Sequence, residues 1–267
     1  MPEARSTTSA VSLRGLRKSF GALETIAGID VEIAEGSFVS VIGPSGCGKS
    51  TLLRVVAGLE HASSGQALVY GEPAIAARRH KQVAMVPQHP GLLPWRTVRT
   101  NARLLLDVNS KANGPTTSDP IELLERVGLG SFLDAHPHEL SGGMQQRVAL
   151  VRALALGAPL LAMDEPLAAL DEITRAEMRG LLNHLVEGRG VTTLFVTHSI
   201  SEAVALSDRV LVSSPRPARI VADIEIDLAR PRRSDIDDDP RFFELCTHVR
   251  HALLHGAAKP ASDDGAH

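Results

Sequence analysis

The stretch GPSGCGKST, residues Gly43 to Thr51, decides the fold of this chain. Gly43, Gly48, Lys49 and Ser50 match the pattern G-x-x-x-x-G-K-[ST]. The apolar run SFVSVI ends directly before the stretch, and the leucines and valines of KSTLLRVVAGL recur at helical spacing after it. The sequence therefore predicts a buried strand, a glycine-rich loop and a helix, in that order.

A loop of this kind is suited to phosphate groups. Glycines let the backbone turn its N–H groups inward, and the start of the following helix adds the positive end of its dipole. We expect Lys49 to reach the β- and γ-phosphates of a nucleotide and the Ser50 hydroxyl to bind Mg²⁺. The residues expected to contact the nucleotide here are Gly43, Pro44, Ser45, Gly46, Cys47, Gly48, Lys49, Ser50 and Thr51. A glycine-rich turn beside a surface lysine is the alternative, and the flanking strand and helix argue against it.

Composition places the chain among soluble globular proteins. Of its 267 residues, 43% are hydrophobic and 22% are charged, and the formal net charge is -3. A slightly acidic chain has no general electrostatic attraction for nucleic acid, so we expect no nucleic-acid partner. Cys47 and Cys246 are too few and too far apart for a disulfide framework, which favours a reducing, cytosolic setting. No stretch has the length and apolar character of a secretory signal or a membrane span.

Short strands and helical patterns alternate along most of the chain. VSLRGL and IDVEIA read as strands before the glycine loop, and VAMV, LLAM, TLFVT and RVLVS read as strands after it. This order is typical of a largely parallel sheet with helices on both faces. Between about Pro90 and Glu139 the strand signals stop and helical patterns remain, which indicates an inserted helical lobe. After Ser214 we expect one more strand, ARIVADIEI, and one helix near RFFELCTHVRHALL.

Two adjacent acids end the apolar run in LLAMDEP. A carboxylate at a strand end opposite the glycine loop can bind the Mg²⁺ of a nucleotide, and a second one can orient or deprotonate an attacking water. Taken alone, Asp164 and Glu165 could simply end a strand before a turn at Pro166. In combination with the glycine loop, Asp164 is predicted to be a metal ligand and Glu165 to act on the water.

The segment LSGGMQQR, which begins at Leu140, resembles the LSGGQ motif of the ATP-binding-cassette (ABC) family. It departs from that motif at Met144, which stands in the fifth position. Ser141, Gly142 and Gly143 open an apolar helical run and so form a second helix start that favours anions. The resemblance implies that the chain binds ATP in a head-to-tail homodimer, in which this helix start covers the γ-phosphate held by the glycine loop of the other subunit.

Four more residues resemble motifs of the same family, in the family's order. Gln88 in VPQHP would contact the Mg²⁺ and the catalytic water, and Asp171 in AALD would reach across the dimer. His198, which follows TLFVT, would hold the γ-phosphate and Glu165 in register. Phe20 in KSFG would stack on adenine, although a lone phenylalanine at a strand end is also common in core packing.

The resemblance covers about residues 11–225 and implies an α/β fold: a P-loop NTPase (RecA-like) core, an N-terminal antiparallel β subdomain and an α-helical subdomain inserted at about 90–150. We expect a disordered N-terminus at 1–10 and a C-terminal extension at 226–267 with a disordered tail. The implied catalytic residues are Glu165, His198, Gln88 and Lys49, and the implied Mg²⁺ ligands are Ser50, Gln88 and Asp164. The implied activity is ATP hydrolysis coupled to transport.

The segments GLLPWRTV, MDEPLAALDEITR and SSPRPARIVADIEIDLARPR resemble importers of nitrate, sulfonates and taurine, and related importers of pyrimidine thiamine precursors share much of this pattern. This branch implies membrane permease subunits, whose coupling helix would dock near Gln88 to Trp95, and a periplasmic or extracellular solute-binding protein. It also implies a peripheral position on the cytoplasmic face of the cell membrane, the inner membrane in a Gram-negative cell. Trp95 would anchor the permease, or else fill the core of the helical lobe.

Three other functions remain open at this point. A soluble cassette ATPase that acts on ribosomes or DNA shares these motifs, but usually has two cassettes in one chain or a long coiled-coil insertion. A nucleotide-binding regulator without hydrolysis would not need both Glu165 and His198. Export instead of import is compatible with the motifs alone.

Overall fold

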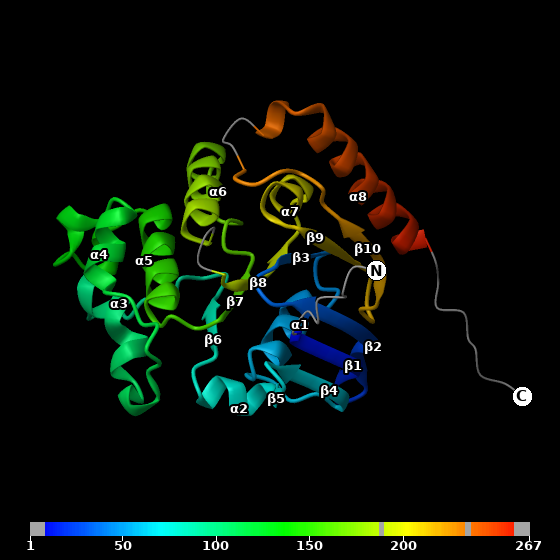
Figure 1. Ribbon diagram of the computed structural model, residues 1–267, viewed down its shortest axis with the longest axis horizontal. Coiled ribbons are helices and arrows are strands. Elements are labelled where there is room, and N and C mark those ends of the chain that lie inside the picture. Colours follow the sequence, from blue (N-terminus) through cyan, green and yellow to red (C-terminus); the bar gives the residue numbers. More distant parts are fainter. Residues whose placement is uncertain (1–8, 187–189, 233–235, 259–267) are drawn as a thin grey trace, which may run out of the picture.

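The computed structural model describes residues 9–186, 190–232 and 236–258. Figure 1 shows two sheets that lie against each other and a separate group of helices at one side. This arrangement matches the predicted α/β fold with an antiparallel β subdomain, a core built on a largely parallel sheet and an inserted helical subdomain. No helix in these ranges is long and apolar enough to cross a lipid bilayer.

The smaller sheet is antiparallel, with the strand order β2-β1-β4-β5. Its strands are β1 (Ser9–Phe20), β2 (Leu23–Ala34), β4 (Ser64–Val69) and β5 (Glu72–Pro73). Apolar residues of β1 and β2 alternate with polar ones, so that one face of the sheet is buried. Since β1 begins at Ser9, Ser9 and Ala10 belong to a strand and not to the disordered N-terminus that we predict for 1–10; residues 1–8 lie outside the described ranges.

The larger sheet has the order β10-β9-β3-β8-β7-β6. Its parallel strands are β3 (Phe38–Ile42), β6 (Val83–Val86), β7 (Leu160–Asp164), β8 (Thr192–Thr197) and β9 (Arg209–Ser213), and β10 (Ile220–Glu225) is antiparallel to β9. Every residue of β3, β7 and β8 is buried, as expected for parallel strands covered on both faces. Because β3, β8 and β7 are neighbours and parallel, the residues that follow them meet at one edge of the sheet.

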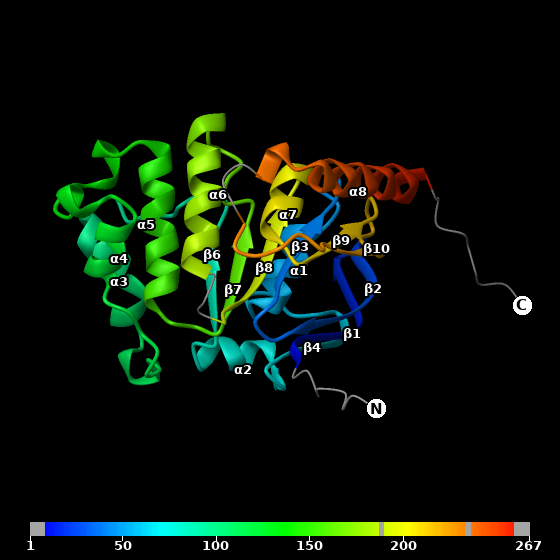
Figure 2. The ribbon, with the colours of Figure 1, turned by 45° about the horizontal axis from the view of Figure 1, so that its top comes forward.

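Helices cover both faces of this sheet. Helix α1 (Lys49–Val56) and the antiparallel sheet pack with Val39 and Val41 of β3, whereas α7 (Ile200–Leu206) and α8 (Pro240–Ala258) pack with Ile42 and with β9. The remaining core helices are α2 (Ala74–Arg79) and α6 (Glu172–Val186). Figure 2, turned by 45°, shows α6, α7 and α8 on the side of the sheet opposite α1 and β1.

The inserted lobe consists of α3 (Val98–Asp107), α4 (Pro120–Arg126) and α5 (Gly142–Ala155), with 3-10 turns at Ser110–Ala112, Gly130–Phe132 and Pro137–Glu139. Each helix starts at a residue whose side-chain oxygen accepts a backbone N–H, which is the usual N-cap arrangement: Thr97, Asp119 and Ser141. The lobe packs through a buried cluster that it shares with β6 and β7. The helices fall almost entirely within the predicted range of about 90–150.

The C-terminal extension is structured as far as Ala258 and lies on the core. Phe242, Leu245 and Val249 of α8 are buried against α7 and β9. The 3-10 turn at Ile236–Asp238 (η4) is tied to α6, because Arg179 donates two hydrogen bonds to Asp237 at 3.1 and 2.5 Å. The predicted disordered tail, at 259–267, lies outside the described residues.

Candidate functional site

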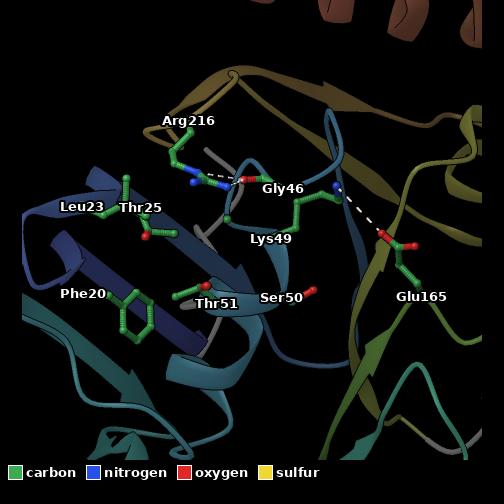
Figure 3. Close-up of a pocket in the computed structure, with 10 residues that line it drawn as sticks. Phe20, Leu23, Thr25, Gly46, Lys49, Ser50, Thr51, Glu165 and Arg216 are labelled. Carbon is green, nitrogen blue, oxygen red and sulfur yellow. Dashed lines mark hydrogen bonds and ion pairs between the residues drawn. The ribbon is translucent and has the colours of Figure 1, made fainter.

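A pocket of about 260 Å³ opens where the antiparallel sheet meets the carboxyl edge of the parallel sheet. Figure 3 shows its walls: Phe20, Leu23 and Thr25 on one side, the glycine loop and Lys49 in the middle, and Glu165 on the far side. The full set of lining residues is Phe20, Leu23, Thr25, Gly46, Gly48, Lys49, Ser50, Thr51, Glu165 and Arg216. Strands distant in the sequence therefore build one cavity around the predicted phosphate loop.

The glycine loop adopts a conformation that only glycine accommodates easily. Gly46 has a φ of 70° and Gly48 a φ of 126°, in the region that residues with a Cβ rarely adopt. A Cβ on Gly48 would also lie only 2.9 Å from the carbonyl oxygen of Thr25, on β2. Both the turn and the close packing against the antiparallel sheet thus depend on the absence of a side chain.

Lys49 places a buried positive charge inside the loop. The residue is 4% exposed, and its Nζ donates to the carbonyl oxygens of Gly43 and Pro44 at 2.9 and 3.0 Å. The Glu165 carboxylate lies 4.0 Å from the same Nζ. Because the hydrogen-bond partners of this buried ammonium are neutral carbonyls, they do not neutralise its charge. The ammonium can therefore attract an anion in the pocket, such as a triphosphate.

The Ser50 hydroxyl and the Asp164 carboxylate lie together at the foot of the loop. Ser50 Oγ donates to Asp164 Oδ1 at 2.8 Å, and Asp164 is 4% exposed. Burial raises the pKa of Asp164, and the hydrogen bond from Ser50 partly opposes that shift. Mg²⁺ prefers an octahedron of oxygen ligands at about 2.1 Å, whose adjacent oxygens are roughly 3 Å apart. The spacing and the chemistry of these two oxygens fit two neighbouring positions around Mg²⁺.

Glu165 and His198 contact each other at the ends of adjacent strands, β7 and β8. Nδ1 of His198 lies 3.0 Å from Oε2 of Glu165, and the backbone N–H of Glu165 donates to Val196 at 2.8 Å. Glu165 has a φ of 43°, which is rare for a residue with a side chain and occurs often at functional sites. A carboxylate held between an imidazole and a lysine, at the edge of a pocket, can accept a proton from a water placed there.

Half of the Phe20 side chain faces solvent at the mouth of the pocket. The residue is 48% exposed, and the ammonium of Lys18 lies 4.6 Å from the centre of its ring. An aromatic face open to the cavity is suited to stacking on a nucleobase. Stacking on adenine stays a prediction that this geometry allows.

Other predicted site residues lie away from the pocket. Gln88 is exposed after β6 and does not line the cavity. Ser141 caps α5, and Asp171 accepts hydrogen bonds from the backbone and hydroxyl of Thr174 at the start of α6. A Cβ on Gly143 would lie 2.7 Å from the Thr174 side chain, so the starts of α5 and α6 touch. Within one chain these helix starts do not reach the pocket, and their predicted role needs a second copy.

Three lining residues were not among the predicted site residues: Leu23, Thr25 and Arg216. Leu23 and Thr25 follow Phe20 across the turn into β2, and Arg216 belongs to the loop between β9 and β10. Figure 3 shows the Arg216 side chain directed at the glycine loop. The segment SSPRPAR contains this arginine, but no local pattern in it indicates a contact with a loop that lies 170 residues earlier.

Trp95 is a surface residue. It is 73% exposed, so the alternative in which it fills the core of the helical lobe is wrong. It lies in the segment that leads from β6 to α3, between the parallel sheet and the inserted helices.

Several known proteins are similar to this chain over much of its length. The family model described as ABC transporter matches residues 26–168. The chain is 45% identical over 224 residues to the aliphatic sulfonates import ATP-binding protein SsuB of Rhodopseudomonas palustris. That alignment covers 84% of this chain and 77% of the relative. The chain is also 44% identical over 253 residues to the aliphatic sulfonates import ATP-binding protein SsuB 1 of Rhizobium johnstonii, in an alignment that covers 94% of this chain and 88% of the relative.

Two solved structures have the same fold. The dimeric structure of MJ0796, a bacterial ABC transporter cassette, is 28% identical, with a TM-score of 0.71 over 82% of this chain and all of that one. A dimeric post-hydrolysis state of the same cassette, bound to ADP and Pi, is 30% identical with a TM-score of 0.70, again over 82% of this chain and all of the other. The chain therefore belongs to the ABC transporter family, in the branch of ATP-binding subunits that contains the aliphatic sulfonate importers.

Proposed function

We propose that this chain is the ATP-hydrolysing subunit of an ABC importer and energises the uptake of a small anion, an aliphatic sulfonate in the first instance. One observation carries the proposal: Lys49, at the start of α1 after the glycine loop, lies beside Glu165 and His198, which follow the adjacent strands β7 and β8 at the edge of the pocket. Binding alone would need the lysine and the loop. The carboxylate and its imidazole neighbour add the means to act on a water.

Hydrolysis in this pocket would depend mainly on positioning and on charge. The glycine loop and Lys49 would hold the phosphates, with Phe20 against the base, and Glu165 would accept the proton of the attacking water. The contact with His198 at 3.0 Å would keep the Glu165 carboxylate directed at that water. Ser50 and Asp164, joined by Gln88 once it turns inward, would hold Mg²⁺, which neutralises charge on the phosphates when bound.

A complete site would need two copies of the chain. The helix starts at Ser141 and Asp171 are exposed and lie next to each other, and Ile173 beside them is 76% exposed. An apolar side chain at a polar helix start is favourable when a partner covers it. We propose a head-to-tail homodimer in which Ser141, Gly142, Gly143 and Asp171 of one subunit cover the nucleotide held by the other.

The permease would dock between the core and the helical lobe. Trp95, in the segment that leads from Gln88 to α3, offers an exposed aromatic anchor, and Leu92 and Leu93 of the same segment are partly exposed. A short amphipathic helix of a membrane subunit suits an apolar surface of this kind. The chain would then lie at the cytoplasmic face of the membrane, with a solute-binding protein on the other side of the complex.

The substrate itself would not touch this subunit. Import of aliphatic sulfonates is what the names of the relatives state for those proteins. Nitrate, taurine or a pyrimidine thiamine precursor would need the same motor, and a cassette that acts on ribosomes or nucleic acid would need no permease. Salt-sensitive retention of the chain on nucleic acid would favour that last function.

The proposed function is tested by reconstituting the chain with its permease subunits in lipid vesicles. We expect ATP hydrolysis to rise when a solute-binding protein loaded with an aliphatic sulfonate is added. Lys49→Ala should abolish both hydrolysis and uptake, and uptake that survived this change would contradict the mechanism. Stimulation by nitrate or by a thiamine precursor alone would identify a different substrate for the same motor.

Docking is tested separately with Trp95→Ala. The variant should weaken copurification with the permease by roughly ten-fold or more, since an exposed aromatic anchor is removed. ATP hydrolysis by the isolated subunit should not change. Phe243→Ala removes another exposed aromatic, 58% exposed on α8, and serves as the matched control. Equal loss of copurification in both variants would argue against a specific anchor at Trp95.

A further inference from the structure

Arg216 contacts the glycine loop from the connection between β9 and β10, residues 214–219. Its Nε and Nη2 donate to the carbonyl oxygen of Gly46 at 3.0 and 2.6 Å, as Figure 3 shows. The side chain lines the pocket, and no motif described above assigns it a role. Two charged N–H donors on one oxygen fix the direction of that peptide group more firmly than a single neutral hydrogen bond would.

The connection that carries Arg216 is itself fixed to the antiparallel sheet. Ala218 donates to the carbonyl of Thr25 at 2.8 Å and accepts from the N–H of Ala27 at 3.0 Å. The glycine loop packs against the same place, because a Cβ on Gly48 would lie 2.9 Å from the Thr25 oxygen and 3.2 Å from the Ala218 Cβ. The loop that would hold the phosphates and the sheet that carries Phe20 are thus joined through residues 214–219.

The contact also determines where a neighbouring N–H points. In a trans peptide the carbonyl of one residue and the N–H of the next point in opposite directions. Since Arg216 holds the Gly46 carbonyl, the N–H of Cys47 is directed away from Arg216, to the inside of the loop, where it lies 3.3 Å from the Pro44 carbonyl. An anion in the loop would be a better acceptor for this N–H than that distant oxygen.

We propose that Arg216 is a positioning residue for the nucleotide: it holds the Gly46–Cys47 peptide with its N–H toward the phosphates and fixes the glycine loop relative to the wall at Phe20. The proposal rests on the proposed function, in which the pocket holds a nucleoside triphosphate. It assigns Arg216 to binding and not to cleavage, because the guanidinium contacts the loop and is absent from the Glu165 and His198 contact.

The test compares Arg216→Ala, Arg216→Lys and Arg219→Ala in the full chain. Arg219 is exposed in the same connection, and the hydrogen bonds that it makes with Ser214 come from its backbone. Arg219→Ala therefore removes one positive charge, as Arg216→Ala does, but leaves the contact with the glycine loop in place. We expect Arg216→Ala to raise the Kd for Mg-ATP and for Mg-ADP roughly ten-fold, with kcat at saturating ATP within about two-fold of the parent. Arg216→Lys, which keeps one donor, should recover part of the affinity, and Arg219→Ala should bind as the parent does.

Isothermal titration calorimetry gives the Kd values, and thermal unfolding reports whether each variant is folded. A parent-like Kd in Arg216→Ala, an equal loss in Arg219→Ala, or a loss of kcat with unchanged Kd would overturn the assignment. If Arg216→Ala does not fold, Arg216→Lys decides, and a parent-like Kd there would overturn it as well. A parent chain that binds no nucleotide would instead refute the proposed function, so the two failures are distinguishable.

Discussion

Glu165 combines an unusual backbone conformation with two functional neighbours. Its φ is 43°, its carboxylate contacts His198 at 3.0 Å, and Lys49 lies 4.0 Å away. A residue that only ended a strand would not need this arrangement. The strained conformation directs the carboxylate to the pocket, where a proton acceptor for water is useful.

Glu165→Gln should bind ATP as the parent does but hydrolyse it at least about a hundred-fold more slowly, because the amide keeps the shape and cannot accept the proton. Steady-state phosphate release and titration with ATP measure the two quantities. His198→Ala should slow hydrolysis less than Glu165→Gln does, since it removes the imidazole that contacts Glu165 and leaves the carboxylate itself in place. Turnover of Glu165→Gln at the parent rate would rule out Glu165 as the proton acceptor.

Glu202 is a buried acid outside the pocket. It is 4% exposed on α7, accepts a hydrogen bond from Thr197 at 2.5 Å and lies 3.5 Å from Arg175. Burial raises the pKa of Glu202 above its ordinary value of 4.5, and the contacts with Thr197 and Arg175 oppose that shift only in part. The folded protein therefore holds the proton of Glu202 more tightly than the unfolded chain does.

This shift makes the free energy of unfolding depend on pH. Between the ordinary pKa and the raised one the folded state carries more protons, so the contribution of Glu202 to stability falls as pH rises through that window. In Glu202→Gln this contribution is absent, and the stability of the variant relative to the parent should increase from about pH 4.5 upward. Urea unfolding at several pH values measures the difference.

Glu122→Gln is the matched control, because Glu122 is exposed on α4 and the substitution removes the same charge. Its stability relative to the parent should not follow the course expected for Glu202→Gln. A difference between Glu202→Gln and the parent that stays constant, or shrinks as pH rises, would contradict the shift.

Among the elements, α8 shows how the C-terminal extension belongs to the core. The helix is amphipathic: Leu245 is 3% exposed and Val249 is fully buried against α7 and β9, whereas Leu254 is 64% exposed. The extension therefore covers a face of the parallel sheet that would otherwise contact water. Removing the extension should therefore lower the free energy of unfolding of the whole domain.

Leu245→Ala should lower the free energy of unfolding by about 2–4 kcal/mol, since it removes a fully packed side chain and leaves a cavity. Leu254→Ala, on the exposed side of the same helix, should change it by less than about 0.5 kcal/mol. Chemical denaturation of the two variants measures the contrast. Similar losses, or none in Leu245→Ala, would mean that α8 does not pack on the core as described.

The elements that the sequence predicted best are those with local causes. The strand, loop and helix around Lys49 follow from apolar spacing and from glycines that the turn requires, and the structure has them in that order. The contact of Arg216 with Gly46 could not be predicted, because it depends on how β9 and β10 place a loop against the antiparallel sheet. The exposure of Trp95 likewise depends on the packing of the lobe and left two alternatives open in the sequence.

In the whole molecule, most of the predicted site residues fall into two groups. One group meets at one edge of the parallel sheet, because the strands that lead to its members, β3, β7 and β8, are neighbours, and the order of strand and helix patterns made this foreseeable: Lys49, Ser50, Asp164, Glu165 and His198. Ser141 and Asp171 lie at the exposed starts of α5 and α6. A second copy that turns these helix starts toward the pocket would unite the two groups.

The central claim, a nucleotide enclosed between two copies, is tested most directly by the mass of the protein in solution. Multi-angle light scattering of Glu165→Gln with Mg-ATP should give twice the monomer mass, and the monomer mass without nucleotide. Adding Ser141→Arg, which places a bulky cation at the α5 start, should abolish the dimer while each monomer still binds ATP. Contradiction would come from a parent chain that stays monomeric at saturating ATP and hydrolyses it at full rate.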